Sequence, residues 1–187
     1  MSRIKSEAII LSPTYREKTP DVKGKTKLKY DPETGHVQHH HTVEHVSTTP
    51  SGHHILRHPN HYYAFNPHTR QIDMHVMGSH WNNGKTFGIH KTAGRKGSTL
   101  KAHELYHHLV THHGLHLESS TEQSRGGMKI WQKLHSMPGV KVTNEDGHRI
   151  RKIGEGVTHH RDTDSHYEHG PLHLVAKPHV SSIHSNR

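Results

Sequence analysis

One stretch of the sequence has the residue types and spacing of a zinc hydrolase. His103-Glu104-Leu105-Tyr106-His107 sets two histidines four residues apart, with a glutamate beside the first. On a helix the two histidines would lie on one face and share a zinc ion, and Glu104 would polarise a zinc-bound water. His113 stands where some of these enzymes have a third ligand, but Val110 replaces the glycine that turns the chain there. Histidine is so abundant in this chain that accidental matches are expected, and zinc is not the cofactor we expect.

A basic loop before a helical pattern is the second candidate site. It comprises Gly94, Arg95, Lys96, Gly97, Ser98 and Thr99. Glycines let the backbone approach a phosphate closely, and a helix start offers free N–H groups and a partial positive charge. Arg95 and Lys96 would add counter-charge. The loop therefore predicts a phosphate site, with a plain basic helix entry as the alternative.

Charge and histidine content point to polyanionic partners. The 187-residue chain carries a formal charge of +9 and 28 histidines, which titrate near pH 6.5 when unperturbed. We expect contact with nucleic acid or another polyanion, strengthened in mild acid; the alternative is a merely soluble surface. Asp162, Asp164 and Glu168 form a small acidic cluster that would either hold a metal or stay solvated.

Several classes of protein are excluded or disfavoured. The chain has no cysteine, so disulfides, thiolate metal sites and cysteine nucleophiles are excluded. The longest apolar run near the start, Ala8 to Leu11, is too short for a signal sequence or a membrane span. We expect a protein that is neither secreted nor membrane-bound, made and used inside a cell or packaged inside a particle.

Three antiparallel strands are predicted in the middle of the chain. Tyr62–Phe65, Gln71–Met77 and Thr86–Ile89 are separated by turns at Asn66–Arg70 and Asn82–Gly84. Alternation in the second strand predicts that Ile72, Met74 and Val76 share one face.

A strand-helix-strand-helix-strand unit follows from Thr86 to Val142. Thr99 is the expected N-cap of a helix that ends near His113, with Gly114 as its C-cap. The expected buried residues of this helix are Leu100, Leu105, Tyr106, Leu109 and Val110. After a strand at Leu115–Ser119, Thr121 would cap a second helix with an inner side of Met128, Ile130, Trp131 and Leu134. Gly126-Gly127 predicts a late helix start or a close contact, and a strand follows at Val140–Val142.

The ends of the chain are polar, and only 28% of all residues are hydrophobic. We therefore expect the ends to depend on a partner for order. A weak hairpin is predicted around Asp31–Gly35, a strand at His148–Ile153 pairing with Val140–Val142, and a last strand at Pro171–Val175. The predicted organisation is an α+β fold: a polar N-terminal arm with a weak hairpin (1–60), a core of hairpins and the β-α-β-α-β unit (61–153), and a histidine-rich tail (154–187).

Part of the core resembles a known family. The relevant pattern is Glu104-Leu105-Tyr106, a short strand ending at Ser119-Ser120, and Gln123-Ser124-x-Gly126-Gly127-x-x-x-Trp131-x-x-Leu134. It resembles phage-encoded GNAT-like (Gcn5-related N-acetyltransferase fold) proteins over about a third of the chain. The resemblance implies that Gly94 to Thr99 hold the pyrophosphate of acetyl-CoA. It also implies Glu118, with the histidines near it, or Ser124 as the group that transfers a proton.

Three functions follow as alternatives. The loop has one glycine where the family register has two, and the second helix lacks the tyrosine that acts as general acid in many family enzymes. These departures favour a structural or assembly role in a virion. The expected partners are other virion proteins, with nucleic acid as a further contact. We expect the chain to work as an oligomer or as part of a complex. The alternatives are an acyl-CoA-dependent N-acyltransferase and a zinc-dependent hydrolase that uses His103, Glu104 and His107.

Overall fold

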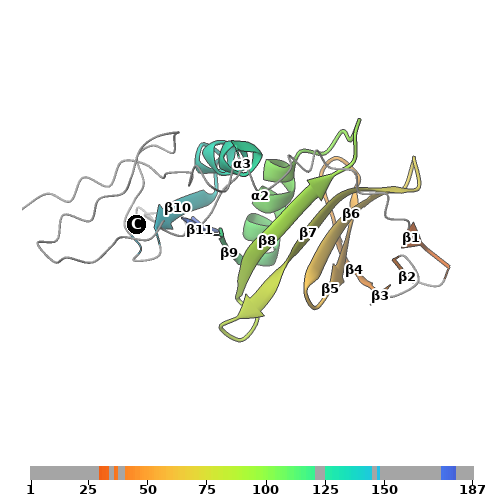
Figure 1. The fold of residues 1–187 in the computed structure, drawn as a ribbon, viewed down its shortest axis with the longest axis horizontal. Coiled ribbons are helices and arrows are strands. Elements are labelled where there is room, and N and C mark those ends of the chain that lie inside the picture. The colour runs from red at the N-terminus through yellow and green to blue at the C-terminus, as the bar shows by residue number, and fades with distance from the viewer. Residues whose placement is uncertain are drawn as a thin grey trace, which may run out of the picture.

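Eight strands form one curled, mixed sheet (Figure 1). The computed structural model describes residues 30–33, 36–37, 41–120, 125–144, 147 and 174–179. The strands of this sheet are β4 (Glu44–Thr48), β5 (His54–His58), β6 (His61–Asn66), β7 (Gln71–Trp81), β8 (Thr86–Gly94), β9 (His116–Glu118), β10 (Val140–Asn144) and β11 (Leu174–Pro178). Their spatial order is β10-β11-β9-β8-β7-β6-β5-β4, and all neighbours are antiparallel except β8 and β9.

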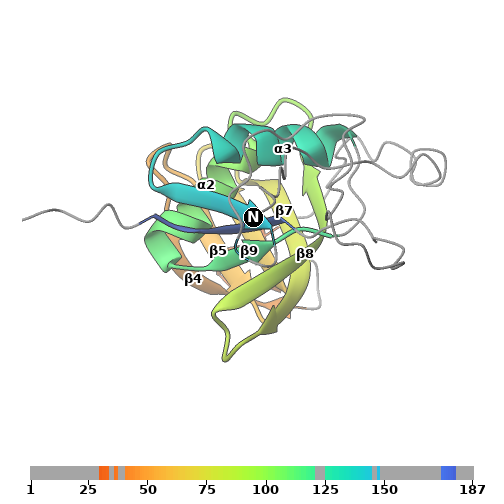
Figure 2. The same cartoon turned by 90° about the vertical axis from the view of Figure 1, so that its left-hand side faces the viewer.

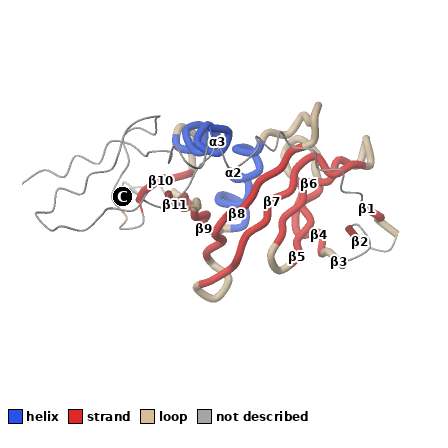
Figure 3. The backbone as a smooth tube through the Cα atoms, viewed as in Figure 1, coloured by secondary structure: helices blue, strands red, loops and turns tan. Residues whose placement is uncertain are grey.

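Two helices pack on the inner face of this sheet. Helix α2 (Ala102–His113) connects β8 to β9, and α3 (Arg125–His135) lies between β9 and β10 in the chain. Figure 3 shows how the sheet curls beside α2, and Figure 2 shows α3 running alongside β10 (teal) and β11 (dark blue), which it contacts. The main core joins apolar residues of the helices to those of the strands, among them Ile55, Phe87, Leu105, Leu109, Leu117, Trp131, Leu134, Val142 and Leu174.

The three central strands and both helices confirm the pattern-based predictions. Gly114 ends α2 in the left-handed conformation (φ 67°), which glycine adopts without steric cost. Gly126 and Gly127 lie at the described start of α3, which begins at Arg125, and the expected cap Thr121 lies outside the described residues. The predicted buried residues of both helices face the core, with Ile130 partly exposed.

The prediction that Ile72 shares a face with Met74 is wrong. The β6–β7 register pairs Ala64 with Met74 but Phe65 with Ile72, so Asp73 is an extra residue in β7. Such a β-bulge reverses the alternation of side chains. Ile72 therefore packs in a second cluster with Leu56, Tyr63 and Phe65.

The strand β11 stands between β9 and β10, although it follows them in the chain. It pairs with both of them, so β10 has β11 as its described partner. At the other end, β1 (Tyr30–Asp31) and β2 (His36–Val37) form the hairpin predicted around Asp31–Gly35, and β3 (His41–Thr42) adds a third strand to this small sheet. The predicted strand at His148–Ile153 and the acidic cluster Asp162, Asp164 and Glu168 lie outside the described residues. No described helix is both long and apolar enough to cross a membrane.

Candidate functional site

The loop between β8 and α2 is built on a tight turn. Gly94 is the last residue of β8, and the Ser98 N–H donates to the Arg95 carbonyl at 3.1 Å. Gly97 lies inside this turn with φ +82°, a conformation that favours glycine. No described residue accepts a hydrogen bond from the amides of Lys96, Gly97 or Thr99, and Lys96 and Thr99 are exposed.

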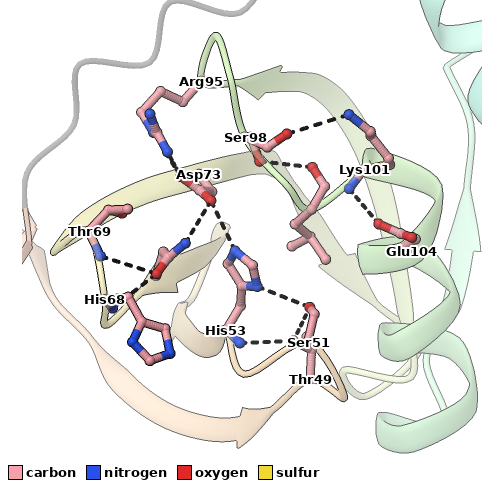
Figure 4. A network of polar contacts seen from close by, with 12 residues as sticks. Thr49, Ser51, His53, His68, Thr69, Asp73, Arg95, Ser98, Lys101 and Glu104 are labelled. Carbon is pink, nitrogen blue, oxygen red and sulfur yellow. Dashed lines mark hydrogen bonds and ion pairs between the residues drawn. The ribbon is translucent and has the colours of Figure 1, made fainter.

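Arg95 is turned inward, onto a buried carboxylate (Figure 4). Its Nε and Nη2 lie 2.7 and 2.6 Å from Oδ1 of Asp73, and its backbone N–H donates to the Asp73 carbonyl at 2.8 Å. Asp73 is fully buried, whereas the Arg95 side chain keeps 26% of its surface. The positive charge of Arg95 is thus already matched within the protein.

Asp73 accepts two further hydrogen bonds at its other oxygen, Oδ2. His53 Nε2 lies 3.0 Å and Asn66 Nδ2 3.3 Å from it. Burial alone would raise the pKa of Asp73, but the hydrogen bonds from His53, Arg95 and Asn66 hold it below its usual value. The bulge, the β4–β5 turn and the loop are therefore joined at one ionised carboxylate.

The same network continues to an exposed hydroxyl. An ionised Asp73 only accepts, so His53 donates from Nε2 and its Nδ1 accepts from the Ser51 hydroxyl at 3.0 Å. The order hydroxyl–imidazole–carboxylate is that of nucleophilic hydrolases. Here Arg95 balances the carboxylate charge, and Ser51 Oγ also bonds Thr49 Oγ1 at 3.0 Å, so the chain of bonds mainly ties the β4–β5 turn to the sheet.

Helix α2 begins at Ala102 with Lys101 as its N-cap, so the expectation of Thr99 as N-cap is wrong. The Lys101 N–H donates to Oε2 of Glu104 at 2.6 Å. A glutamate at this helical position reaches back to the start of the helix and satisfies one of its free N–H groups. The start of α2 therefore carries a carboxylate of its own.

The residues of the zinc pattern have other contacts. His107 Nε2 bonds the Pro138 carbonyl at 2.8 Å, so this nitrogen carries the proton. The pKa of His103 is lowered by burial and by the charge of Lys133. Among the described residues, no three His, Asp or Glu side chains are placed to hold a metal ion.

The parallel strands β8 and β9 separate close to Glu118. Their pairing runs from Thr86–His116 to Gly88–Glu118, while β8 continues to Gly94 with no partner on this side among the described residues. Glu118 is half-buried, and no described residue bonds its carboxylate. The other proton-transfer candidate, Ser124, lies outside the described residues.

A histidine cluster between β4 and α2 was not singled out by sequence reasoning. Ser47 Oγ lies 2.9 Å from Nε2 of His108 and 2.7 Å from Nε2 of His113. A hydroxyl has one proton, so one imidazole accepts from Ser47 while the other donates to it. Burial and the neighbouring histidines lower the pKa of His108 to about 4.

The described residues define an α+β protein with an eight-stranded mixed, curled sheet and two helices on its inner face. No protein-family model and no curated protein matches the sequence.

Proposed function

We propose that the chain is a GNAT-like protein of the phage-encoded kind, with a structural or assembly role in a virion. The element order β8–α2–β9–α3–β10, preceded by the β6–β7–β8 hairpins, agrees with what the resemblance implies. The parallel pairing of β8 and β9 across α2 supports the same assignment.

The engagement of the loop by the protein's own carboxylates carries this proposal. The Asp73 carboxylate accepts from the Arg95 guanidinium, and the Asp73 backbone carbonyl accepts from the Arg95 N–H. The Glu104 carboxylate accepts from the Lys101 N–H at the start of α2. A pyrophosphate at this loop would compete with Glu104 and receive little from Arg95. These contacts favour a role that does not depend on acyl-CoA.

An acyl-CoA-dependent N-acyltransferase is the second candidate. The separation of β8 and β9 after Gly88 favours it, because no described strand pairs with this edge of β8 beside the half-buried Glu118. The amides of Lys96 and Gly97, which have no acceptor among the described residues, are groups that bind phosphate in such loops.

Calorimetric titration of the full chain with acetyl-CoA separates these functions. We expect no binding at millimolar ligand, because the loop already holds its own carboxylates. Glu104→Gln removes the competing carboxylate at the helix start and is expected to bring weak binding into the measurable range. Pantetheine, which lacks the pyrophosphate, should bind neither form.

Tight binding by the wild-type chain that Gly97→Glu abolishes would contradict the proposal and favour the acyltransferase. The assembly role further requires that the chain sediments with assembled particles from its native source.

A further inference from the structure

A transverse row of side chains crosses the outer face of the sheet, opposite the helices. Trp81 pairs with Thr86, Thr86 with His116, and Lys177 with Lys141 in the strand registers. The β9–β11 register, Ala176 opposite Leu117, continues to Lys177 opposite His116. Directly paired residues point to the same face of a sheet. Successive residues of a strand point to opposite faces, and the neighbours of these residues in the sequence belong to the core beside the helices: Phe87, Leu117, Ala176 and Val142. The row therefore faces away from the helices.

We call this row, together with the adjacent Lys85, the basic row: Trp81, Lys85, His116, Lys177 and Lys141.

Trp81 lies at one end of the basic row. A Cβ placed on Gly88 would come within 1.9 Å of the far end of the Trp81 ring, so the indole covers this glycine. The rest of the ring reaches solvent. Trp81 is 40% exposed, and no other large hydrophobic residue in the described part of the chain is exposed.

Three lysines, none with a carboxylate partner among the described residues, lie along the rest of the basic row with His116. Lys141 and Lys177 stand directly opposite each other on β10 and β11, an arrangement that destabilises a sheet when both residues carry the same charge. The backbone of Lys85 accepts from the His116 N–H at 2.9 Å, which places this lysine beside the row. Burial and the charges of Lys177 and Lys85 lower the pKa of His116. Within the described residues, none of the three lysines forms an ion pair.

One described carboxylate, Glu118, lies on the same face as the basic row. It follows His116 by two residues on β9 and stands opposite Gly88 on β8. On its other side it stands opposite Val175, and no ion pair joins it to a lysine among the described residues. The described residues therefore leave the lysine repulsion uncompensated, and an external anion would relieve it.

We propose that the basic row binds single-stranded nucleic acid, with an unpaired base stacked on Trp81 and the phosphates along Lys85, Lys177 and Lys141. An exposed aromatic side chain beside a line of cations is the combination that single-strand binding surfaces use. Neighbouring strands are about 4.8 Å apart, so the row from β7 to β10 spans about 19 Å, enough for a few nucleotides. A duplex keeps its bases stacked inside and offers none to Trp81. The inference goes beyond the proposed function, takes up the nucleic-acid contact expected from the charge of the sequence, and is independent of the acyl-CoA loop.

Quenching of tryptophan fluorescence by single-stranded oligothymidylate tests the stacking. The protein has two tryptophans, and Trp131 is only 2% exposed, so quenching reports on Trp81. We expect quenching on binding at low salt, its loss in Trp81→Ala, and an affinity about five- to a hundredfold weaker in that variant. Trp81→Phe, which keeps a ring, should retain most of the affinity. The emission of Trp131 and the circular dichroism of each variant verify the fold.

Salt dependence tests the lysines separately. Each phosphate contact contributes about 0.7 to the slope of log affinity against log salt for a single strand. The pair Lys85→Gln and Lys177→Gln should therefore lower the slope by about 1.4. The matched pair Lys129→Gln and Lys133→Gln changes two lysines on α3, away from the outer face, and should leave the slope unchanged.

Three results would overturn the proposal: no quenching at low salt, unchanged affinity in Trp81→Ala, or equal binding of duplex and single strand. Equal competition by inorganic polyphosphate would likewise show a plain anion surface without stacking. None of these results alters the acetyl-CoA titration, so the two proposals fail independently.

Discussion

The buried Asp73 carboxylate has three side-chain partners, and their hydrogen bonds set its contribution to stability. Arg95, His53 and Asn66 all donate to a side chain without solvent exposure. The substitution Asp73→Asn keeps the shape of the side chain but removes the counter-charge of Arg95. It also turns the NH2 group of the new asparagine toward groups that themselves donate hydrogen bonds. Hydrogen bonds to charged groups contribute about 1.5–3 kcal/mol each. We expect the free energy of unfolding, measured with urea, to fall by about 2–3 kcal/mol.

An exposed ion pair supplies the control for Asp73. Arg57 Nη2 lies 2.8 Å from Oε2 of Glu44, but the two side chains are 50% and 64% exposed. Exposed pairs contribute about 0–1 kcal/mol, so Glu44→Gln should cost less than about 1 kcal/mol. A double-mutant cycle of Asp73→Asn with Arg95→Gln should show strong coupling. Additive effects of these two substitutions would mean that Asp73 and Arg95 act separately.

Two glycines on neighbouring strands limit how β7 and β8 approach each other. A Cβ on Gly78 would lie 2.1 Å from the backbone oxygen of Gly88, which cannot recede without breaking the β7–β8 pairing. A Cβ on Gly88 would instead meet the far end of the exposed Trp81 side chain. Overpacking a core typically costs about 1–3 kcal/mol. We expect Gly78→Ala at or above the upper end of that range in urea unfolding, and Gly88→Ala well below it.

Tryptophan fluorescence of the same samples adds a second readout for the glycine pair. Gly88→Ala should shift the emission of Trp81, because the indole must leave the strand to make room for the new methyl group. Equal stability losses in the two variants would contradict the distinction between a rigid backbone neighbour at Gly78 and a movable side chain at Gly88.

Elements with a clear period were predictable, whereas pairings between distant segments were not. The apolar spacing of Leu105 and Leu109 and the Asn82–Gly84 turn follow from local chemistry, and both appear where expected. The bulge at Asp73 left no local signal, because a charged residue between Ile72 and Met74 is what an ordinary half-exposed strand also shows. For the same reason the contact of Asp73 with Arg95, 22 residues away, was missed. The place of β11 between β9 and β10 depends on tertiary pairing alone.

Histidine burial gives the whole molecule a defined response to acid. Six described histidines have a lowered pKa, and burial is the largest cause for each of them. For most of them the second cause is the charge of a neighbouring lysine or histidine. The six are His54, His80, His103, His108, His113 and His116. A depressed folded-state pKa means that the folded protein prefers the neutral imidazole. Below pH 6.5 the unfolded chain therefore binds more protons than the folded one, and stability falls as pH decreases.

We expect the free energy of unfolding to be nearly constant from pH 8 to 7 and then to fall progressively from pH 6.5 to 4. His108, with a pKa of about 4, spans this window. It faces Ser47 on β4 and His107, His112 and His113 on its own helix, and Arg57 on β5 acts on the adjacent His113. Each proton that distinguishes the two states contributes about 1.4 kcal/mol per pH unit to the slope. Urea unfolding at a series of pH values measures this slope.

The variant His108→Gln isolates one titrating group from the rest. Glutamine keeps a group that can bond Ser47 but does not titrate. The slope of the unfolding free energy against pH between pH 6.5 and 4 should therefore lose the contribution of up to one proton. His45→Gln is the matched control, because His45 is exposed and bonds the Ser47 carbonyl at 2.8 Å at the edge of the same cluster. A stability that stays flat or rises on acidification, or a slope that His108→Gln leaves unchanged, would show that the buried imidazoles do not control the acid response.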